Sequence, residues 1–386
     1  MPGFVFNTTR QLIVEHGAAE RLHEVVGKFS AERIFVVTDP GIAELGLLGP
    51  AIENLEKYGA KVELFDGVVA DPPEAVVLEA VERARRMRAQ LVIGFGGGSS
   101  MDVAKLVACF AHLHCRQSLQ EAYGVGNLEG ERLPLVQVPT TAGTGSEVTP
   151  ISIVTTGETT KSGIVSPVLL PDVAVLDATL TVGLPRHVTA ATGIDAMVHA
   201  IEAYTSKIRK NPMSDTLARE ALRLLVTHID RVMQDGRDLE ARQAMLLGSC
   251  LAGQAFANAP VAAVHALAYP LGGHYHVPHG LSNALVLPAV LRFNAVTAAD
   301  LYAELAPIFT QEARSRSNVD DCESFIASIE ALLKRSGLPL RLRDVGVLES
   351  SLDELASDAM QQQRLLVNNP REVTERDALE IYRTVY

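Results

Sequence analysis

Residues 90–105 read QLVIGFGGGSSMDVAK, so that an apolar run, three successive glycines and a helical pattern follow one another. The apolar run is typical of a buried strand, and the glycines allow a tight turn into a helix. Backbone N–H groups in such a loop, at the N-terminus of a helix, can bind a phosphate group. Because Ser99 stands where a dinucleotide fingerprint has its last glycine, the loop also fits a simple strand–helix turn.

The first half of the chain repeats this alternation of strand and helix. Four more short apolar runs are typical of strands, at residues 33–38, 62–65, 133–138 and 173–176. Residues 73–88 have the amphipathic spacing of a helix. Strands that alternate with helices predict a parallel sheet covered by helices on both faces.

The pattern changes near residue 184, and helical periodicity then continues to Tyr386, for example over residues 215–233 and 239–257. A chain of 386 residues is also too long for one ordinary hydrophobic core. We therefore predict two domains. Residues 1–183 form an α/β nucleotide-binding domain with a Rossmann-like parallel sheet of non-standard topology, and residues 184–386 form an all-α metal-binding domain.

Histidines and one aspartate in the helical half have the spacing of a metal site. Asp195 and His199 are four residues apart, so that on a helix both side chains project from one face. His265 and His279 flank a segment rich in proline and glycine, which can fold two imidazoles towards one point. Such a mixed nitrogen and oxygen site suits Fe(II) or Zn(II) and leaves room for a substrate oxygen. By spacing alone, His274 and His276 could replace either neighbour.

Two segments at predicted strand ends have the chemistry of a nucleotide site. Asp39 ends the strand at residues 33–38, where a carboxylate can accept hydrogen bonds from ribose hydroxyls, although TDPG at 38–41 is also a good turn sequence. Asp39 precedes the glycine loop, whereas the ordinary fingerprint has its acid about twenty residues after it, so the topology is not standard. Residues 138–147, VPTTAGTGSE, form a second loop whose small hydroxyl residues can bind a pyrophosphate or a carboxamide.

The composition argues against several classes of function. A net charge of −12, the absence of tryptophan and an aromatic content of 5% argue against binding to nucleic acid or an anionic membrane. No run approaches the ~18 uninterrupted apolar residues of a membrane span, and the N-terminus lacks the pattern of a secretory signal. The four cysteines are scattered, as in reduced cytosolic proteins. We expect a cytoplasmic protein that acts on a small molecule.

In combination, these motifs resemble those of the iron-dependent (group III) alcohol dehydrogenases, a family that includes lactaldehyde reductases and propanediol dehydrogenases. The resemblance covers essentially the whole chain. The motifs that carry it are Gly96-Gly97-Gly98-Ser99 with Asp102 and Lys105, residues 139–147, residues 193–202, and Pro278-His279-Gly280. The resemblance implies the same two domains, and we expect a homo-oligomer, a dimer or larger.

The resemblance also implies roles for individual residues. Asp195, His199, His265 and His279 match the metal ligands of the family, and Asp39 matches the residue associated with preference for NAD over NADP. The implied cofactor-binding residues are Gly97, Gly98, Ser99, Asp102, Thr140, Thr141, Thr144, Ser146 and Lys161. The implied activity is the NAD(H)-linked interconversion of an alcohol and an aldehyde or ketone, with Fe(II) or Zn(II) as a Lewis acid on the substrate oxygen.

One position departs from the family pattern. Tyr269 stands four residues after His265, where many members carry a histidine. A tyrosine there is similar to the related hydroxyacid–oxoacid transhydrogenases, which retain their nucleotide, and such an activity is the first alternative. We expect Tyr269 to position the substrate, while protons move through the cofactor ribose, water or His276. The alternative role is packing before Pro270, with the hydroxyl group in solvent.

Two further alternatives belong to other classes of function. A lyase similar to dehydroquinate synthase would have to hold an anionic substrate near the metal. The segments around His265 and His279 contain no lysine or arginine before Arg292, which counts against that interpretation. A non-catalytic metal-binding protein is the other alternative, and any measurable turnover would exclude it.

Overall fold

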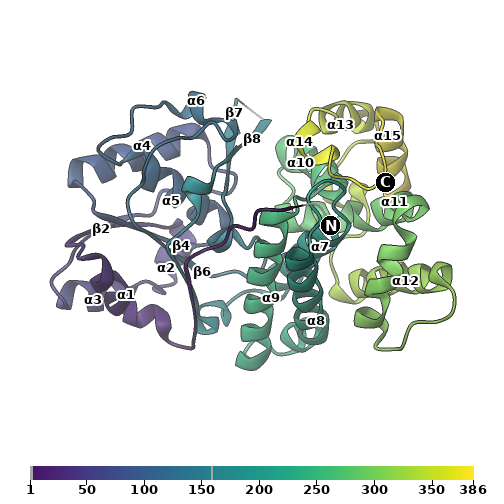
Figure 1. Ribbon diagram of the computed structural model, residues 1–386, viewed down its shortest axis with the longest axis horizontal. Helices are drawn as coiled ribbons and strands as arrows, with labels where there is room; N and C mark the ends of the chain where they lie inside the picture. The colour runs from purple at the N-terminus through teal and green to yellow at the C-terminus, as the bar shows by residue number, and fades with distance from the viewer. Residues whose placement is uncertain (1–2, 158–159) are drawn as a thin grey trace. The chain divides into compact units, whose positions relative to one another are not determined.

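The computed structural model describes residues 3–157 and 160–386, which divide into two compact units. One unit comprises residues 7–183 and contains both β-sheets. The other comprises residues 184–386 together with the segment that ends at Phe6, and all its described regular elements are helical. Figure 1 shows the sheet-containing unit in purple to teal and the helical unit in green to yellow. The predicted fold class, a parallel α/β unit followed by a helical unit, is confirmed.

The main sheet has six parallel strands in the spatial order β1–β9–β6–β4–β2–β3. The strands are β1 (Gln11–Val14), β2 (Arg33–Val37), β3 (Lys61–Phe65), β4 (Leu91–Gly96), β6 (Leu135–Pro139) and β9 (Val173–Leu176). The sequence pattern predicts all of these except β1. This strand has only four residues and lies at the edge of the sheet with no residue fully buried, so it lacks an apolar signal.

The order of the strands predicts a ligand site at one end of the sheet. β2 lies between β3 and β4, so the chain reverses its direction of winding at β2. In open parallel sheets, ligands bind at the carboxyl ends of the strands where such a reversal occurs. Asp39 follows β2 and the glycine loop follows β4, and these two strands are hydrogen-bonded neighbours.

Side chains of the main sheet alternate between two hydrophobic cores. Phe35 and Val37 belong to the core that contains α4 (Glu74–Met87) and α5 (Gly98–Phe110). Ile34 and Val36 belong to the other core, with α1 (Leu22–Val26) and α3 (Gly49–Lys57). Burial of each such side chain contributes roughly 1.5–3 kcal/mol, and a shift of one residue would exchange the two faces, so the register is strongly specified. Figure 1 shows the two helical layers on opposite sides of the sheet.

A second, three-stranded sheet, which the sequence pattern does not predict, adjoins α5. Its strands are β5 (Gly124–Val125), β7 (Ile151–Thr156) and β8 (Thr160–Val165), in the order β5–β8–β7. β7 and β8 pair antiparallel, whereas β5 pairs parallel with β8. The two remaining short α-helices of this unit are α2 (Pro40–Glu44) and α6 (Leu119–Ala122).

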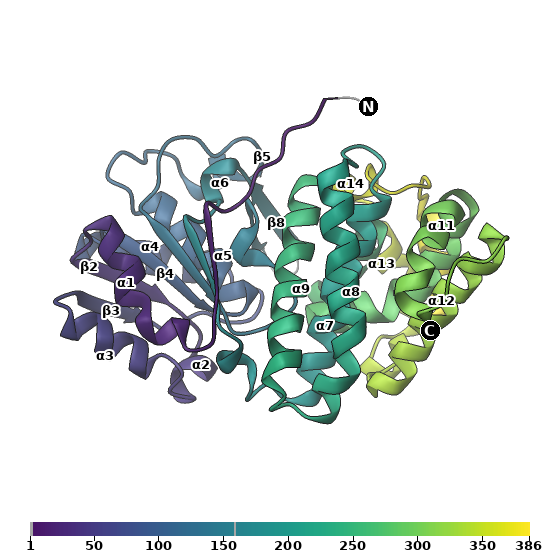
Figure 2. The same cartoon turned by 60° about the horizontal axis from the view of Figure 1, so that its bottom comes forward.

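The helical unit is built around α7, which is buried on nearly all sides. Its α-helices are α7 (Arg186–Thr205), α8 (Pro212–Gln234), α9 (Leu239–Asn258), α10 (Ala263–Tyr275), α11 (His279–Thr310), α12 (Asn318–Ser336), α13 (Leu352–Ala359), α14 (Gln363–Leu366) and α15 (Glu375–Thr384). Figure 2 shows α7, α8 and α9 side by side. The side chains of Asn211 and Asp238 cap the first turns of α8 and α9, which stabilises both helix starts.

Two helices differ from what the sequence pattern predicts. α10 continues through Pro270 to Tyr275, so that the interruption between His265 and His279 is only the segment 276–278. α11 is long and apolar enough to cross a membrane by length and composition. It packs against α7, α10 and α12, and its largely buried N-terminal half forms part of the core of the helical unit.

Candidate metal centre and nucleotide site

Three helices bring the four predicted ligands together. Asp195 and His199 lie one turn apart on α7, His265 lies in the first turn of α10, and His279 is the first residue of α11. One donor atom from each of these side chains lies within 4.8 Å of the donor atoms of the other three. The short segment between α10 and α11 allows His265 and His279 to reach the same point from two helices.

The centre is buried on all sides but one. Asp195, His199 and His265 are each at most 4% exposed, whereas the side chain of His279 is 31% exposed. The ring of His199 stacks between those of Phe256 and His265, at centroid distances of 4.4 and 4.7 Å. Three ligands are therefore held by packing, and the side of His279 is open to a small molecule.

The side-chain chemistry of the centre fits a divalent cation. Oδ1 of Asp195 lies 3.6 Å from Nε2 of His279 and 4.0 Å from Nε2 of His265. Burial would raise the pKa of Asp195, but the attraction of His199, His279 and His265 and a hydrogen bond from Asn283 together hold that pKa below its usual value. An ionised carboxylate that faces imidazole nitrogens in a buried place is a good donor set for Fe(II) or Zn(II).

Two residues outside the predicted set hold the ligands in place. His265 donates through Nδ1 to Oε2 of Glu202 at 2.6 Å, and Oε1 of Glu202 accepts a hydrogen bond from the backbone N–H of Val264. Because Nδ1 carries the proton, Nε2 of His265 presents its lone pair towards Asp195. Asn283 donates to Oδ1 of Asp195 at 2.5 Å, while its own side-chain oxygen is buried without a hydrogen-bond partner. An orphaned oxygen beside the ligands is a further polar group that a cation can satisfy.

Gly280 allows the first turn of α11 to reach α7. A Cβ atom on this residue would lie 2.5 Å from the carbonyl oxygen of Ala191 and 2.8 Å from its carbonyl carbon. Since both atoms belong to the backbone of α7, no side-chain movement can relieve such a clash. Glycine is therefore required here for the close approach that places His279 beside Asp195.

We predict that Gly280→Ala lowers both stability and metal affinity. Overpacking of this kind costs about 1–3 kcal/mol, which in a domain of this size lowers Tm by several degrees. Calorimetry and metal titration measure the two effects. Gly49→Ala is the matched control, since a Cβ atom there meets nothing within 4 Å. A Gly280→Ala protein with unchanged Tm and unchanged metal affinity would contradict the argument.

The other predicted residues of this unit lie in different surroundings. His274 contacts Oδ2 of Asp358 at 2.5 Å, and His276 is an exposed residue with positive φ at the end of α10; neither belongs to the group of metal ligands. Tyr269 is 8% exposed, so its side chain is almost entirely buried, as both the substrate-positioning role and the packing role allow. Its ring lies 6.0 Å from that of His279, and Nη2 of Arg364 lies 3.5 Å from its hydroxyl oxygen.

In the sheet-containing unit, Asp39 lies beside the glycine loop. Its Oδ1 accepts a hydrogen bond from the N–H of Ile42 and caps α2, and its Oδ2 accepts one from Ser100 at 3.3 Å. Gly96 has φ of 153°, and a Cβ atom on it would lie 2.7 Å from the Ser100 hydroxyl and 3.2 Å from Oδ2 of Asp39. Asp39 is thus both a turn residue and a neighbour of the loop, as the order of β2 and β4 requires.

The two predicted cofactor loops pack on each other. A Cβ atom on Gly98 would lie 2.7 Å from the Cγ2 atom of Thr144, and the N–H of Thr140 donates to the carbonyl of Gly96 at 3.0 Å. Thr141 lies beside Gly97. Ser99 is partly exposed in the first turn of α5, whose N-terminus faces the loop. These contacts hold small side chains and backbone N–H groups together, as a phosphate site needs.

A buried lysine, Lys105, joins Asp102 and Ser146. It belongs to the glycine-loop motif, but the sequence alone predicts no role for it. Nζ of Lys105 donates to Ser146, Thr149 and the carbonyl of Ile151 at 2.7, 3.0 and 2.6 Å. Ser146 in turn donates to Asp102, which also accepts from the N–H of Ile153. Burial lowers the pKa of Lys105, while Asp102 opposes that change. The network ties α5 to the second loop and to β7.

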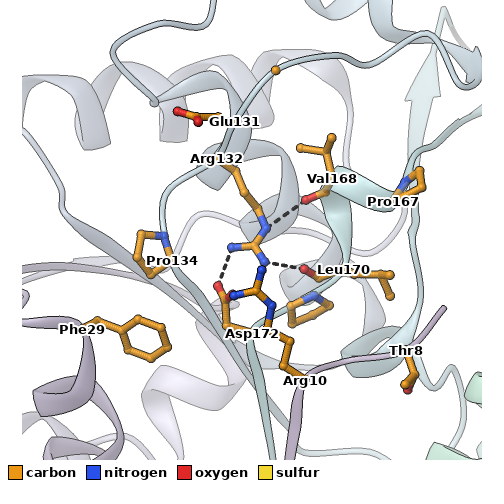
Figure 3. Close-up of a pocket in the computed structure, with 12 residues that line it drawn as sticks. Thr8, Arg10, Phe29, Glu131, Arg132, Pro134, Pro167, Val168, Leu170 and Asp172 are labelled. Carbon is orange, nitrogen blue, oxygen red and sulfur yellow. Dashed lines mark hydrogen bonds and ion pairs between the residues drawn. The ribbon is translucent and has the colours of Figure 1, made fainter.

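Lys161 on β8 lies apart from this network and pairs with Asp71 at 2.6 Å. A pocket of about 610 Å³ lies at the amino ends of β1, β6 and β9, the end of the main sheet remote from the glycine loop (Figure 3). Arg132 spans this pocket and bonds Asp172 and the carbonyls of Val168 and Leu170. Arg132 and Asp172 pair with each other, and the bonds of Arg132 tie together the segments that precede β6 and β9.

Comparison with known proteins agrees with this arrangement. A family model described as iron-containing alcohol dehydrogenase matches residues 9–178, and the C-terminal model of the Fe-containing alcohol dehydrogenase family matches residues 189–386. Long-chain-alcohol dehydrogenase 1 of Geobacillus thermodenitrificans is 41% identical over 371 residues, which cover 96% of this chain and 93% of that protein.

Solved structures show the same likeness. A 1,3-propanediol oxidoreductase superposes with a TM-score of 0.95 at 35% identity, over all of both chains. The sulfoacetaldehyde reductase of Bifidobacterium kashiwanohense, solved in complex with NAD⁺, superposes with a TM-score of 0.88 at 27% identity, over 100% of this chain and 99% of the other. With the two family models and the 41% identity, these likenesses show that the chain belongs to the iron-containing alcohol dehydrogenase family.

Proposed function

We propose that this NAD(H)-linked alcohol and aldehyde oxidoreductase transfers hydride with the help of one divalent ion held by Asp195, His199, His265 and His279. The observation that carries the proposal is the convergence of these four side chains within 4.8 Å in a member of this family. When bound, the ion supplies a Lewis acid for the substrate oxygen, and NAD supplies or accepts the hydride. Fe(II) is the ion that we propose, and Zn(II) suits the same donors.

The protein's own residues hold and orient the reactants. Glu202 fixes the ring of His265, Asn283 fixes Asp195, and Phe256 covers the ring of His199 and excludes water from that side. His279 is the only one of the four side chains that is partly exposed, so we propose that the substrate approaches beside it. Tyr269, one turn after His265 on α10, would orient the substrate there, and the exposed His276 would exchange protons with solvent.

We propose that residues 1–183 bind NAD and that residues 184–386 bind the metal. Gly97, Gly98 and Ser99 would hold the pyrophosphate at the start of α5, with Thr140, Thr141 and Thr144 in the second loop. Asp102 and Ser146 would complete the site through the network around Lys105, and Lys161 would contact the cofactor from β8. A solved relative in complex with NAD⁺ supports this assignment.

We expect the enzyme to prefer NAD over NADP. The extra phosphate of NADP would lie near the carboxylate of Asp39, and like-charge repulsion there is worth on the order of 1–3 kcal/mol. Asp39→Gly should therefore reduce the preference by about tenfold, at little cost to the α2 cap, since glycine is tolerated at that position. The ratio of kcat/KM for NAD and NADP measures the effect. Asp66→Asn, after the neighbouring strand β3, is the control, and a wild-type preference for NADP would contradict the role of Asp39.

Tyr269 favours one alternative, a hydroxyacid–oxoacid transhydrogenase that retains its nucleotide. Full turnover of a simple alcohol with free NAD would exclude it. The segments around the histidines contain no basic residue before Arg292, but the structure brings Arg364 next to Tyr269, so a basic residue does lie near the metal centre. The family match to alcohol dehydrogenases, rather than the absence of a basic residue, is what disfavours the lyase.

The proposal is tested by anaerobic purification with metal analysis, followed by a screen of short alcohols, diols, aldehydes and oxo acids with NAD(H). One equivalent of metal per chain with reversible NAD-linked turnover supports it. Metal-independent turnover, or stoichiometric metal without turnover of any of these substrates, would overturn it. We further expect a cytoplasmic homo-oligomer of two or more subunits.

A further inference from the structure

A basic residue lies one side chain away from the metal centre. Nη2 of Arg364, on α14, donates to the hydroxyl oxygen of Tyr269 at 3.5 Å. The ring of Tyr269 is in turn tilted by 52° against that of His279, at a centroid distance of 6.0 Å. Arg364 is 95 positions from Tyr269 in the sequence, so only the packing of α14 against α10 brings the guanidinium to this place.

Arg364 has no anionic partner in the part of the chain that the structure describes. No carboxylate oxygen of the described residues lies within 4.0 Å of its guanidinium, and its only hydrogen-bond acceptor there is the Tyr269 hydroxyl. A guanidinium has five N–H groups, and a half-buried one gains from an anion that accepts two of them at once. Other partly or fully buried arginines are satisfied from within: Arg132 pairs with Asp172, and Arg242 bonds Thr189 and two carbonyls.

The guanidinium also lies near the open side of the centre. Asp195, His199 and His265 are buried, whereas His279, whose ring lies 6.0 Å from that of Tyr269, is partly exposed. A small molecule whose oxygen approaches His279 would therefore extend along Tyr269. An anionic group at its far end would meet Arg364.

We propose that Arg364 binds an anionic group of the substrate, and that the preferred substrates are short aldehydes or ketones, with the corresponding alcohols, that carry a carboxylate or a sulfonate. This rests on the proposed hydride transfer at the same centre. The planar fork of arginine matches the oxygens of both anions. Tyr269 is a positioning residue in this account, because its hydroxyl holds the guanidinium beside the centre.

The test compares two aldehydes of equal chain length with NADH as reductant, butanal and 4-oxobutanoate, in which a carboxylate replaces the terminal methyl group. The variants are Arg364→Gln, Arg364→Lys and Tyr269→Phe. Arg223→Gln is the control, since Arg223 is an exposed residue paired with Glu220 on α8. Metal content and Tm are measured for each protein, and binding of succinate, which cannot be reduced, is measured by calorimetry.

We expect wild type to have the higher kcat/KM for 4-oxobutanoate. Arg364→Gln should lower kcat/KM for that substrate about tenfold or more, while kcat/KM for butanal changes less than about twofold. Arg364→Lys should restore part of the loss, and Tyr269→Phe should give a smaller loss with unchanged metal content. Equal losses of kcat/KM for both aldehydes in Arg364→Gln, or an unchanged ratio of the two kcat/KM values, would overturn the proposal. Turnover of butanal would in that case leave the proposed hydride transfer intact. If neither aldehyde is reduced by wild type, the proposed function fails. In that case, equal dissociation constants of succinate for wild type and Arg364→Gln would also reject the anion site.

Discussion

His279→Ala is expected to remove most of the bound metal and to lower turnover by about a thousandfold or more, because the loss of several kcal/mol of Lewis-acid stabilisation corresponds to a factor of that size. His279 is the partly exposed member of the four candidate ligands and begins α11, so its replacement by alanine should leave no cavity in the buried core. NAD affinity should remain within a few-fold of wild type, since the loops proposed to bind the cofactor belong to the other unit. Metal analysis, steady-state kinetics and NAD titration measure the three quantities.

His187→Ala is the matched control, because His187 is an exposed histidine in the first turn of α7, the helix that carries Asp195 and His199. It should retain both metal and activity. Full activity of a metal-depleted His279→Ala protein would show that the four side chains are not the functional centre.

Glu202→Gln is expected to weaken metal binding by about 10- to 100-fold, the usual effect of removing a partner that orients a ligand. The carboxylate of Glu202 is buried and accepts hydrogen bonds from Nδ1 of His265 and from the N–H of Val264. Glutamine keeps the size of the side chain but no longer offers a negative charge to the ring. The ring of His265 then loses its fixed tautomer and orientation, and the donor lone pair of Nε2 is less well directed.

Competition with a chromophoric chelator measures this metal affinity directly, without turnover. Glu220→Gln is the control, since Glu220 is a partly exposed glutamate on α8 that lies outside the centre. Equal dissociation constants for wild type and Glu202→Gln would contradict a role for Glu202 in positioning His265. A lower Tm with unchanged metal affinity would restrict Glu202 to packing.

Much of the fold follows from local patterns. Four of the six strands of the main sheet, β2, β4, β6 and β9, are buried almost throughout and are largely apolar runs, because a strand buried on both faces leaves little room for polar side chains. β1 is half-exposed at the edge and is short, so no such signal is present. The β7–β8 hairpin carries threonines and a lysine whose partners, such as Asp71, come from distant parts of the chain, and local periodicity does not reveal them.

The candidate site likewise contains residues that local patterns predict and residues that they do not. Asp195 and His199 could be predicted as a pair because helical spacing fixes their relative position, and the motifs added His265 and His279. The sequence pattern predicts that proline and glycine interrupt the segment after His265, yet α10 accommodates Pro270 and ends only at Tyr275. Glu202, Asn283 and Arg364 act through long-range contacts, so their roles appear only once the helices are packed.

The central claim is that one ion per chain, held by Asp195, His199, His265 and His279, makes NAD-linked turnover possible. The most direct measurement is the rate of NADH formation from an alcohol by chelator-treated wild-type protein as Fe(II) is returned under anaerobic conditions, with bound metal determined at each step. We predict a rate near zero without metal that rises in proportion to bound ion and saturates at one ion per chain, and no such rise for His279→Ala. NADH formation at the full rate by metal-free protein, or an equal recovery by His279→Ala, would contradict the account.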